Sequence, residues 1–281
     1  MKYQKFFLSL TLVILALSGC KSEYEVLLEG TDPDAKYKAA FEYFNQGKFM
    51  RSAQLFESLA SVSGGTSRDD TVQYYWGLSN YRFKDYYTAE TNFTNFVMNY
   101  PLSPFAQDAR YYRIDCLFRQ TLRYELDQKP THSCIATLKE YLGDYPDSPY
   151  RDLCNGMLDE LNGRLDKKAF ENARLYYNME DYLASTVALR NVLKDNSENI
   201  YREEVLYYIA MSSFKYASLS TVAKQKERYL VFVDDYLNFI GEYPDSDHRR
   251  ELNVLYRRAQ RALGKNPGPE EEEAGEEQIE K

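Results

Sequence analysis

The sequence predicts an all-α fold, an α-solenoid of about five helix pairs with a capping helix at the C-terminal end. Apolar residues recur at helical spacing through nearly the whole chain, as in Tyr37, Ala40, Phe41 and Phe44, and strand-like alternation is absent. The 27 tyrosines and 15 phenylalanines outnumber the 13 glycines and 9 prolines, which favours long helices packed through aromatic side chains. The motif Tyr-Pro-x-Ser also recurs along the chain, which indicates an internal repeat.

The repeated motif marks joints between helix pairs. Its copies begin at Tyr100, Tyr145 and Tyr243, each at the end of an apolar helical stretch. Proline disfavours a helical conformation in the residue before it, and serine can cap the helix that follows. We therefore expect one helix to end and the next to begin at each copy.

The clearest helix pair lies between Tyr74 and Pro101. Its first helix carries Gly77, a turn follows near residue 85, and its second helix carries Ala89 and Phe93. The two small residues let the helices approach each other, and the phenylalanine fills the groove toward the next pair. This spacing resembles the tetratricopeptide repeat.

The remaining pairs are less regular. A weaker copy begins near Lys36, and the third pair has a long connector at about residues 127–131, between a helix that ends near Tyr124 and one that begins at Ser133. Two further pairs follow. A terminal helix from Arg249 to Leu263 covers the last apolar face, as the end of a solenoid requires.

The N-terminus predicts export and lipidation. Lys2 and Lys5 precede an apolar run over residues 6–17, which is long enough for a signal peptide and too short to span a bilayer. The run ends in Leu-Ser-Gly-Cys20, which resembles a bacterial lipobox; the alternative is an ordinary secretory signal with an incidental cysteine. We expect a signal peptide over 1–19, a lipidated Cys20 with a linker over 20–33, the repeats over 34–265 and a disordered acidic tail over 266–281.

Charge argues against nucleic acid as a partner. The net charge is −8, and residues 270–281 alone contain seven glutamates and one lysine, so the repeats are only mildly acidic. The sequence has no basic stripe of the kind that binds phosphates. The acidic tail is interpreted as a solvated appendage, with an acidic interaction segment as the alternative.

The sequence predicts no catalytic, metal or cofactor site. The two histidines, His132 and His248, stand in unrelated segments, so neither a histidine-centred triad nor a histidine metal site is complete. There is no glycine-rich phosphate loop. Beyond Cys20 the cysteines are Cys116, Cys134 and Cys154, and this odd number fits either one disulfide or three buried thiols.

The order of these features resembles one family. A lipobox, a short linker, five tetratricopeptide-like units with Tyr-Pro-x-Ser joints, an enlarged third turn and a capping helix are together similar to the BamD family of outer-membrane assembly lipoproteins. The resemblance implies a subunit of the machine that inserts β-barrel proteins into the outer membrane. It also implies two partners, the periplasmic domains of BamA and unfolded outer-membrane β-barrel proteins.

A concave repeat surface would give such a protein a peptide-binding groove. Counting along the first helices of the first two pairs places seven residues on this face: Tyr37, Phe41, Phe44, Tyr74, Leu78, Tyr81 and Arg82. Barrel substrates end in alternating aromatic segments, so we expect the aromatic strip to bind them and Arg82 to meet a carboxylate or a carbonyl. The alternative is that these rings form the core between repeats.

The terminal helix offers a second candidate surface. Arg249, Arg250, Arg257, Arg258 and Arg261 lie in or beside it, largely away from its leucine stripe. A basic helix face is usually only solvated. The family resemblance implies instead that Arg257 and Arg258 meet an acidic patch on BamA.

Two other functional classes stay open. One is a periplasmic tetratricopeptide adaptor for cell-envelope or peptidoglycan machinery, although the coiled coil common in that class is absent from the sequence. The other is a SusD-like glycan-binding lipoprotein, which requires a much larger chain.

Overall fold

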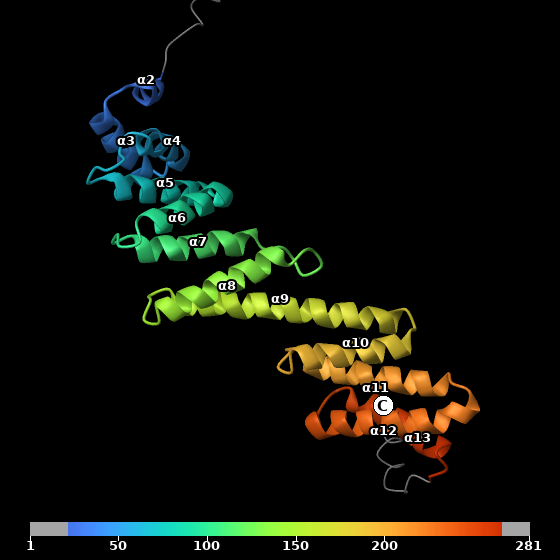
Figure 1. Ribbon diagram of the computed structural model, residues 1–281. Helices are drawn as coiled ribbons and strands as arrows, with labels where there is room; N and C mark the ends of the chain where they lie inside the picture. The colour runs from blue at the N-terminus through green and yellow to red at the C-terminus, as the bar shows by residue number, and fades with distance from the viewer. Residues whose placement is uncertain (1–21, 266–281) are drawn as a thin grey trace, which may run out of the picture. The chain divides into compact units, whose positions relative to one another are not determined.

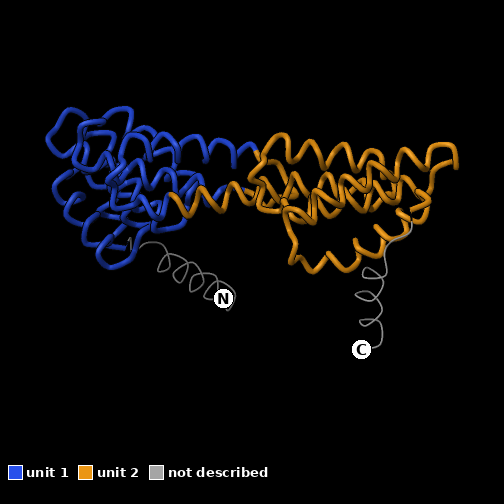
Figure 2. Tube along the Cα trace, turned by 90° about the horizontal axis from the view of Figure 1, so that it is seen from below, with its two compact units in different colours: residues 1–121, 129–154 blue, residues 122–128, 155–281 orange. Residues whose placement is uncertain are grey.

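The computed structural model describes residues 22–265, so the predicted signal peptide, Cys20 and the acidic tail lie outside the described residues. Within this range the chain forms twelve helices and no strand, which confirms the predicted all-α class (Figure 1). The helices group into two compact units (Figure 2). Unit 1 contains the described residues up to 121 together with 129–154, and unit 2 contains 122–128 and the residues from 155 onward.

Unit 1 is a stack of three helix pairs preceded by a short helix. The short helix α2 lies within the predicted linker, where Ser22 and Glu25 form a capping box. Consecutive helices pack side by side through the stack. The elements are α2 (Glu23–Glu29), α3 (Pro33–Asn45), α4 (Phe49–Ala60), α5 (Asp69–Phe83), α6 (Tyr86–Asn99), α7 (Ala106–Gln120) and α8 (Lys129–Asp144).

Unit 2 contains two further pairs and the terminal helix. Its first helix begins in unit 1 and is continuous for 28 residues. The terminal helix buries Leu252, Leu255 and Ala259, as predicted for a capping helix. The elements are α9 (Arg151–Asn178), α10 (Tyr182–Asp195), α11 (Arg202–Ser218), α12 (Val222–Glu242) and α13 (Arg249–Ala262).

The enlarged third turn lies earlier in the chain than predicted. Helix α7 ends at Gln120, because Thr121 is extended, and α8 already begins at Lys129. The connector over 121–128 is tied down by polar contacts that helical periodicity does not reveal. Arg164 Nη1 donates to the carbonyl oxygen of Leu122 at 2.9 Å, and Lys168 Nζ donates to that of Tyr124 at 2.9 Å.

The three Tyr-Pro-x-Ser motifs form the joints that the sequence predicts. Helices α6, α8 and α12 each end at the residue before the motif tyrosine. The serine precedes the next helix and organises the turn, because its Oγ accepts a backbone N–H two residues later, at 3.2 Å for Phe105, 3.1 Å for Tyr150 and 3.1 Å for His248. Serine therefore shapes the joint without being the cap residue itself.

A planar side chain then joins each helix pair to the pair before it. The residue two positions after the motif serine stacks on a tyrosine in the first helix of the preceding pair. The ring centroids are 4.5 Å apart for Phe105 and Tyr74, 3.9 Å for Tyr150 and Tyr111, and 4.0 Å for His248 and Tyr207. These stacks hold successive pairs in register.

Two segments of the chain repeat one another. Residues 33–85 in unit 1 and 166–218 in unit 2 align without a gap, and several matched positions make matched contacts. Buried hydroxyls pair at 3.0 Å between Ser52 and Ser79 and at 2.9 Å between Ser185 and Ser212. The hairpin turns match as well, with Gly47 and Glu180 both in the left-handed region. The two units are therefore built on the same local frame.

Candidate functional site

The predicted groove residues of α3 form one aromatic cluster. The rings of Tyr37 and Phe41 lie 5.0 Å apart, and Phe41 and Phe44 both contact the ring of Tyr75 on α5, at 4.6 and 5.4 Å. All three predicted residues are partly buried. They therefore pack against the second pair while keeping part of their surface accessible.

The predicted groove residues of α5 divide into two groups. Tyr74 and Leu78 are buried, with exposed fractions of 5% and 7%, because this stripe of α5 packs against α6 and the joint residue Phe105. Tyr81 is partly buried and donates from its hydroxyl to Asp115 Oδ2 at 2.6 Å, and Arg82 is exposed. Tyr74 and Leu78 thus lie in the core and not on an open surface. Peptide binding by the seven residues stays a prediction.

A pocket of about 230 Å³ opens beside Tyr37, where α3 meets the loop between α4 and α5. Its lining includes Pro33, Leu59, Val62 and Arg68. The Arg68 guanidinium lies 4.9 Å from the centre of the Tyr37 ring, and its Nη1 is 2.6 Å from Asp34 Oδ1. An aromatic face beside an exposed cation can bind an apolar side chain together with a carboxylate or a carbonyl.

Arg68 is a residue that the sequence analysis missed. It occupies the joint position that holds Phe105 and Tyr150 in later joints, and it covers Tyr37 as those rings cover Tyr74 and Tyr111. The signal that could have identified it is the position two residues after a joint hydroxyl, here that of Thr66, whose Oγ1 lies 3.4 Å from the Arg68 backbone nitrogen.

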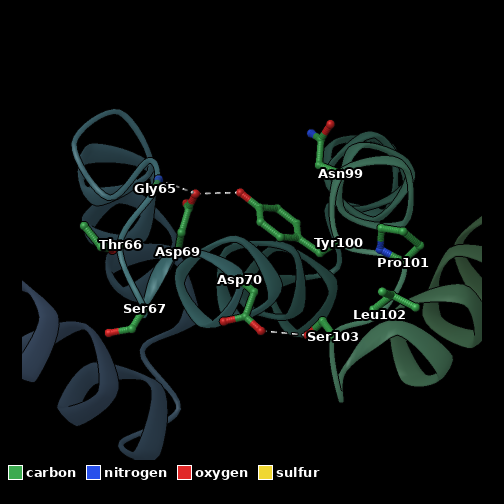
Figure 3. A pocket seen from close by; sticks show the side chains of 10 residues that line it. All are labelled: Gly65, Thr66, Ser67, Asp69, Asp70, Asn99, Tyr100, Pro101, Leu102 and Ser103. Atoms are coloured by element: carbon green, nitrogen blue, oxygen red, sulfur yellow. Dashed lines mark hydrogen bonds between the residues drawn. The ribbon is translucent and has the colours of Figure 1, made fainter.

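A second pocket, of about 510 Å³, lies between the first two joints (Figure 3). It is lined by residues 65–67, Asp69, Asp70 and 99–103, and Figure 3 shows Asp69 reaching between Gly65 and Tyr100 while Asp70 points to Ser103. Leu102 is 97% exposed at its edge. The pocket therefore combines backbone, an apolar edge and two carboxylates.

Both carboxylates are engaged within the joints. Asp69 accepts hydrogen bonds from Ser63 Oγ at 2.9 Å and Tyr100 Oη at 2.7 Å, and Asp70 accepts one from Ser103 Oγ at 2.8 Å. Burial alone would raise the pKa of Asp69, but the hydrogen bonds from its neighbours outweigh burial and lower the pKa. Asp69 is thus held ionised, and its contacts indicate a structural role at the joint.

The arginines of α13 lie as the sequence predicts relative to the buried stripe. Arg258 is exposed and Arg257 is partly buried, beside Tyr256, whose ring stacks on Tyr236 at 4.3 Å. Their role in partner binding stays a prediction.

The three described cysteines are free thiols in the core of unit 1. Cys116, Cys134 and Cys154 are fully buried. Burial raises the pKa of Cys116 to about 12 and that of Cys154 to about 11, so these thiols are protonated and unreactive at neutral pH. The lipidation candidate, Cys20, lies outside the described residues.

The part of the chain that the structure describes contains neither a cluster of metal ligands nor a membrane-spanning helix. Across residues 22–265, no group of three or more histidine, cysteine or acidic side chains is arranged to hold a metal ion. In the same range, none of the helices combines the length and the apolar composition needed to cross a membrane.

The chain is similar to a known protein family and to a curated bacterial protein. A family model described as "Outer membrane lipoprotein" (YfiO) matches residues 30–230. The outer membrane protein assembly factor BamD of Caulobacter vibrioides is 22% identical over 245 residues, which cover 86% of this chain and 78% of that protein. These matches confirm the resemblance to the BamD family.

Solved tetratricopeptide proteins show a weaker likeness. The TPR2AB domain of yeast Sti1, in a complex described as TPR2AB-domain:pHSP90, is 13% identical with a TM-score of 0.43, over 82% of this chain and 84% of that one. A thermophilic tetratricopeptide protein of Thermus thermophilus is 14% identical with a TM-score of 0.32, over 81% of this chain and 98% of that one. The fold assignment rests on the helix pairs described above.

Proposed function

Because the chain belongs to the outer membrane lipoprotein family, we propose that it is a scaffold subunit of the outer-membrane β-barrel assembly complex, held at the periplasmic face by a lipid on Cys20. The family match over residues 30–230 carries this proposal. The Caulobacter relative is an outer membrane protein assembly factor, which supports the assembly role. Paired helices that leave pockets between joints suit a protein that binds other polypeptides.

The proposed partners are the periplasmic domains of BamA and unfolded outer-membrane β-barrel proteins. We assign the substrate to unit 1. The aromatic face of Tyr37 and the exposed guanidinium of Arg68, which line one pocket there, support this assignment. An aromatic side chain near the end of a barrel strand would enter the apolar part of the pocket, and the guanidinium would meet its carbonyl or terminal carboxylate. The arginines Arg257 and Arg258 are the proposed contacts for BamA.

Substrate binding is tested with a fluorescent peptide that carries the alternating aromatic C-terminus of a barrel protein. We expect Tyr37→Ala and Arg68→Gln each to weaken binding by about tenfold, the size of one lost charged or aromatic contact. Tyr37 replaces Tyr74 in this test because truncation of the buried Tyr74 would disturb the core. The control is Tyr87→Ala on α6, where the tyrosine is 77% exposed. Unchanged affinity in both pocket variants, with a normal circular dichroism spectrum, would reject the site.

The partner assignment is tested by co-purification from solubilised outer membranes. Recovery of BamA with the wild-type chain, and its loss in an Arg257→Glu, Arg258→Glu variant, is the expected result. Recovery of glycan importers or of division proteins in place of BamA would overturn the assembly role.

Replacement of Cys20 by serine should release the chain from the membrane fraction. Serine has no thiol to carry a lipid, and two or more acyl chains are needed for stable anchoring.

A further inference from the structure

The two matched segments differ in what covers their first hairpin. In unit 1, α2 lies on the α3/α4 hairpin and packs Tyr24, Leu27 and Leu28 against its aromatic cluster. The Tyr24 ring lies 5.4 Å from that of Tyr43, and its hydroxyl donates to Gln54 Oε1 at 2.5 Å. This face thus receives a short amphipathic helix through an aromatic contact and a hydroxyl acceptor.

Cations complete the receiving face in unit 1. The Arg51 guanidinium lies 5.0 Å from the centre of the Tyr24 ring, and Lys48 Nζ lies 5.5 Å from that of Tyr43. Helix α2 is acidic, since Glu23, Glu25 and Glu29 account for three of its seven residues. An acidic helix therefore lies on a hairpin face that carries basic side chains, as charge complementarity favours.

The matched face in unit 2 keeps the ring and loses the polar groups. Tyr176 matches Tyr43, but Val187 replaces Gln54 and Ala184 replaces Arg51. The surrounding apolar side chains have exposed fractions of 43% to 67%. We call this surface the α9/α10 patch; it consists of Leu175, Tyr176, Met179, Leu183 and Val187.

The charge beside the patch is also reversed. Asp181 stands where unit 1 has Lys48, and Glu180 stands where it has Gly47, both exposed in the turn between α9 and α10. An acidic helix would be repelled here. This disfavours α2 of a second copy as the occupant, and it disfavours the acidic residues 270–281 of the chain itself.

We propose that the α9/α10 patch binds a short basic amphipathic helix of a partner protein, which presents phenylalanine or leucine where α2 presents Tyr24. The helical form follows from the matched face in unit 1, where the same hairpin frame receives a helix. The preference for phenylalanine follows from Val187, because a tyrosine hydroxyl buried against valine loses the acceptor that Gln54 supplies. The preference for basic residues follows from Glu180 and Asp181.

The test uses two stapled, fluorescein-labelled peptides. One has the sequence of residues 23–29, and the other has the same sequence with each glutamate replaced by lysine and Tyr24 by phenylalanine. The full chain is held in phosphatidylcholine nanodiscs, so that no free detergent competes for the patch, and empty nanodiscs are the blank. Fluorescence anisotropy should give an affinity for the basic phenylalanine peptide at least about tenfold higher than for the acidic one.

Three variants locate the binding site. Val187→Gln should weaken binding of the basic peptide by about tenfold, and Leu183→Gln should have a similar effect. Val231→Gln is the matched control on α12, since Val231 is 43% exposed and outside the patch, and it should leave the affinity unchanged. Circular dichroism and the melting temperature establish that each variant folds.

Three outcomes would overturn the proposal. These are equal affinity for the two peptides, binding that Val187→Gln and Leu183→Gln leave intact, and a dimer in sedimentation velocity that Val187→Gln dissociates, because the patch would then be an interface between copies. The proposed substrate site lies in unit 1, so binding of barrel peptides at Tyr37 and Arg68 is measured separately and its result is independent of this one.

Discussion

The two matched segments, residues 33–85 and 166–218, have the same arrangement of helices and turns. They differ in where a guanidinium packs against an aromatic ring. In the first segment the ring of Tyr37 is covered by Arg68, whose side chain is 54% exposed and lines a pocket. In the second segment the matched pair is Phe170 and Tyr201, stacked at 5.4 Å. An aromatic residue in unit 2 thus takes the place of the cation at the unit 1 joint.

In the second segment a guanidinium instead lies between α9 and α11. Arg174 matches Phe41, and its guanidinium lies 5.4 Å from the Phe170 ring and 5.9 Å from the Tyr208 ring, with Nη2 bonded to Glu171 at 2.7 Å. The buried serines and stacked rings thus maintain the shared frame, while exchange of a ring for a guanidinium decides where an accessible charged pocket forms. Four stability predictions test this equivalence.

The largest effect is expected from a matched pair of core truncations. Phe56→Ala in unit 1 should lower the free energy of unfolding by about 3–5 kcal/mol, because the side chain is fully buried and its removal leaves a cavity. Leu189→Ala, at the matched position in unit 2, should cost about 2–5 kcal/mol. Hydrogen exchange combined with a urea titration measures the free energy of unfolding of each unit. A loss below about 1 kcal/mol at only one of the sites would show that the two frames are packed differently.

Acid sensitivity should differ between the matched joint positions Asp69 and Arg202. The hydrogen bonds that lower the pKa of Asp69 stabilise the fold above the ordinary aspartate pKa of about 4, and this contribution is lost as the pH falls through the lower pKa of the folded state. Asp69→Asn should therefore cost about 2 kcal/mol at pH 7 and less at pH 2. Urea unfolding between pH 2 and pH 7 measures how this cost in the free energy of unfolding changes with pH.

The pH dependence of Asp69→Asn is compared with that of a variant at the ion pair in unit 2. Arg202 bonds Glu242, and the hydrogen bond from Arg202 lowers the pKa of that carboxyl. Glu242→Gln should have the same sign of pH dependence with a smaller effect, because the Glu242 side chain is 33% exposed and solvent screens the pair. A penalty for Asp69→Asn that does not change with pH would show that Asp69 is not held as the carboxylate.

The serine pairs should give equal and moderate effects. Ser79→Ala and Ser212→Ala each remove one hydroxyl from a buried pair and should each cost about 1 kcal/mol in the free energy of unfolding. Ser61→Ala, at an exposed serine, is the control with little expected change. Thermal and urea unfolding of the three variants give the comparison, and a cost at only one pair would contradict a shared frame.

Local signals predicted the helices and the joints, because helical periodicity and the Pro-x-Ser order act over a few residues. The same signals could not place Tyr74 and Leu78 correctly, since an apolar stripe has the same periodicity whether it faces an open groove or the next helix pair. The stack of Arg68 on Tyr37 joins different helix pairs and has no periodic signature. Helix α2 has only seven residues, too few for helical periodicity to stand out from the predicted linker, and its packing on α3 and α4 is a tertiary effect.

The smallest effect is expected at the hairpin turns, where the two segments solve one backbone problem with different residues. Gly47 has a φ of 72° and Glu180 a φ of 62°, a region that costs a residue with a Cβ atom and leaves glycine unstrained. Relief of this strain in Glu180→Gly should therefore stabilise unit 2 by about 0.5–1 kcal/mol, and the entropy that glycine adds to the unfolded chain makes the net gain smaller. Gly47→Ala should destabilise unit 1 by about 1 kcal/mol. A Cβ atom at Gly47 meets no atom within 4 Å, so a cost there comes from the backbone conformation alone. If urea unfolding gave the two substitutions the same sign, the turns would not be equivalent, and the frame shared by the two units would end before the hairpin.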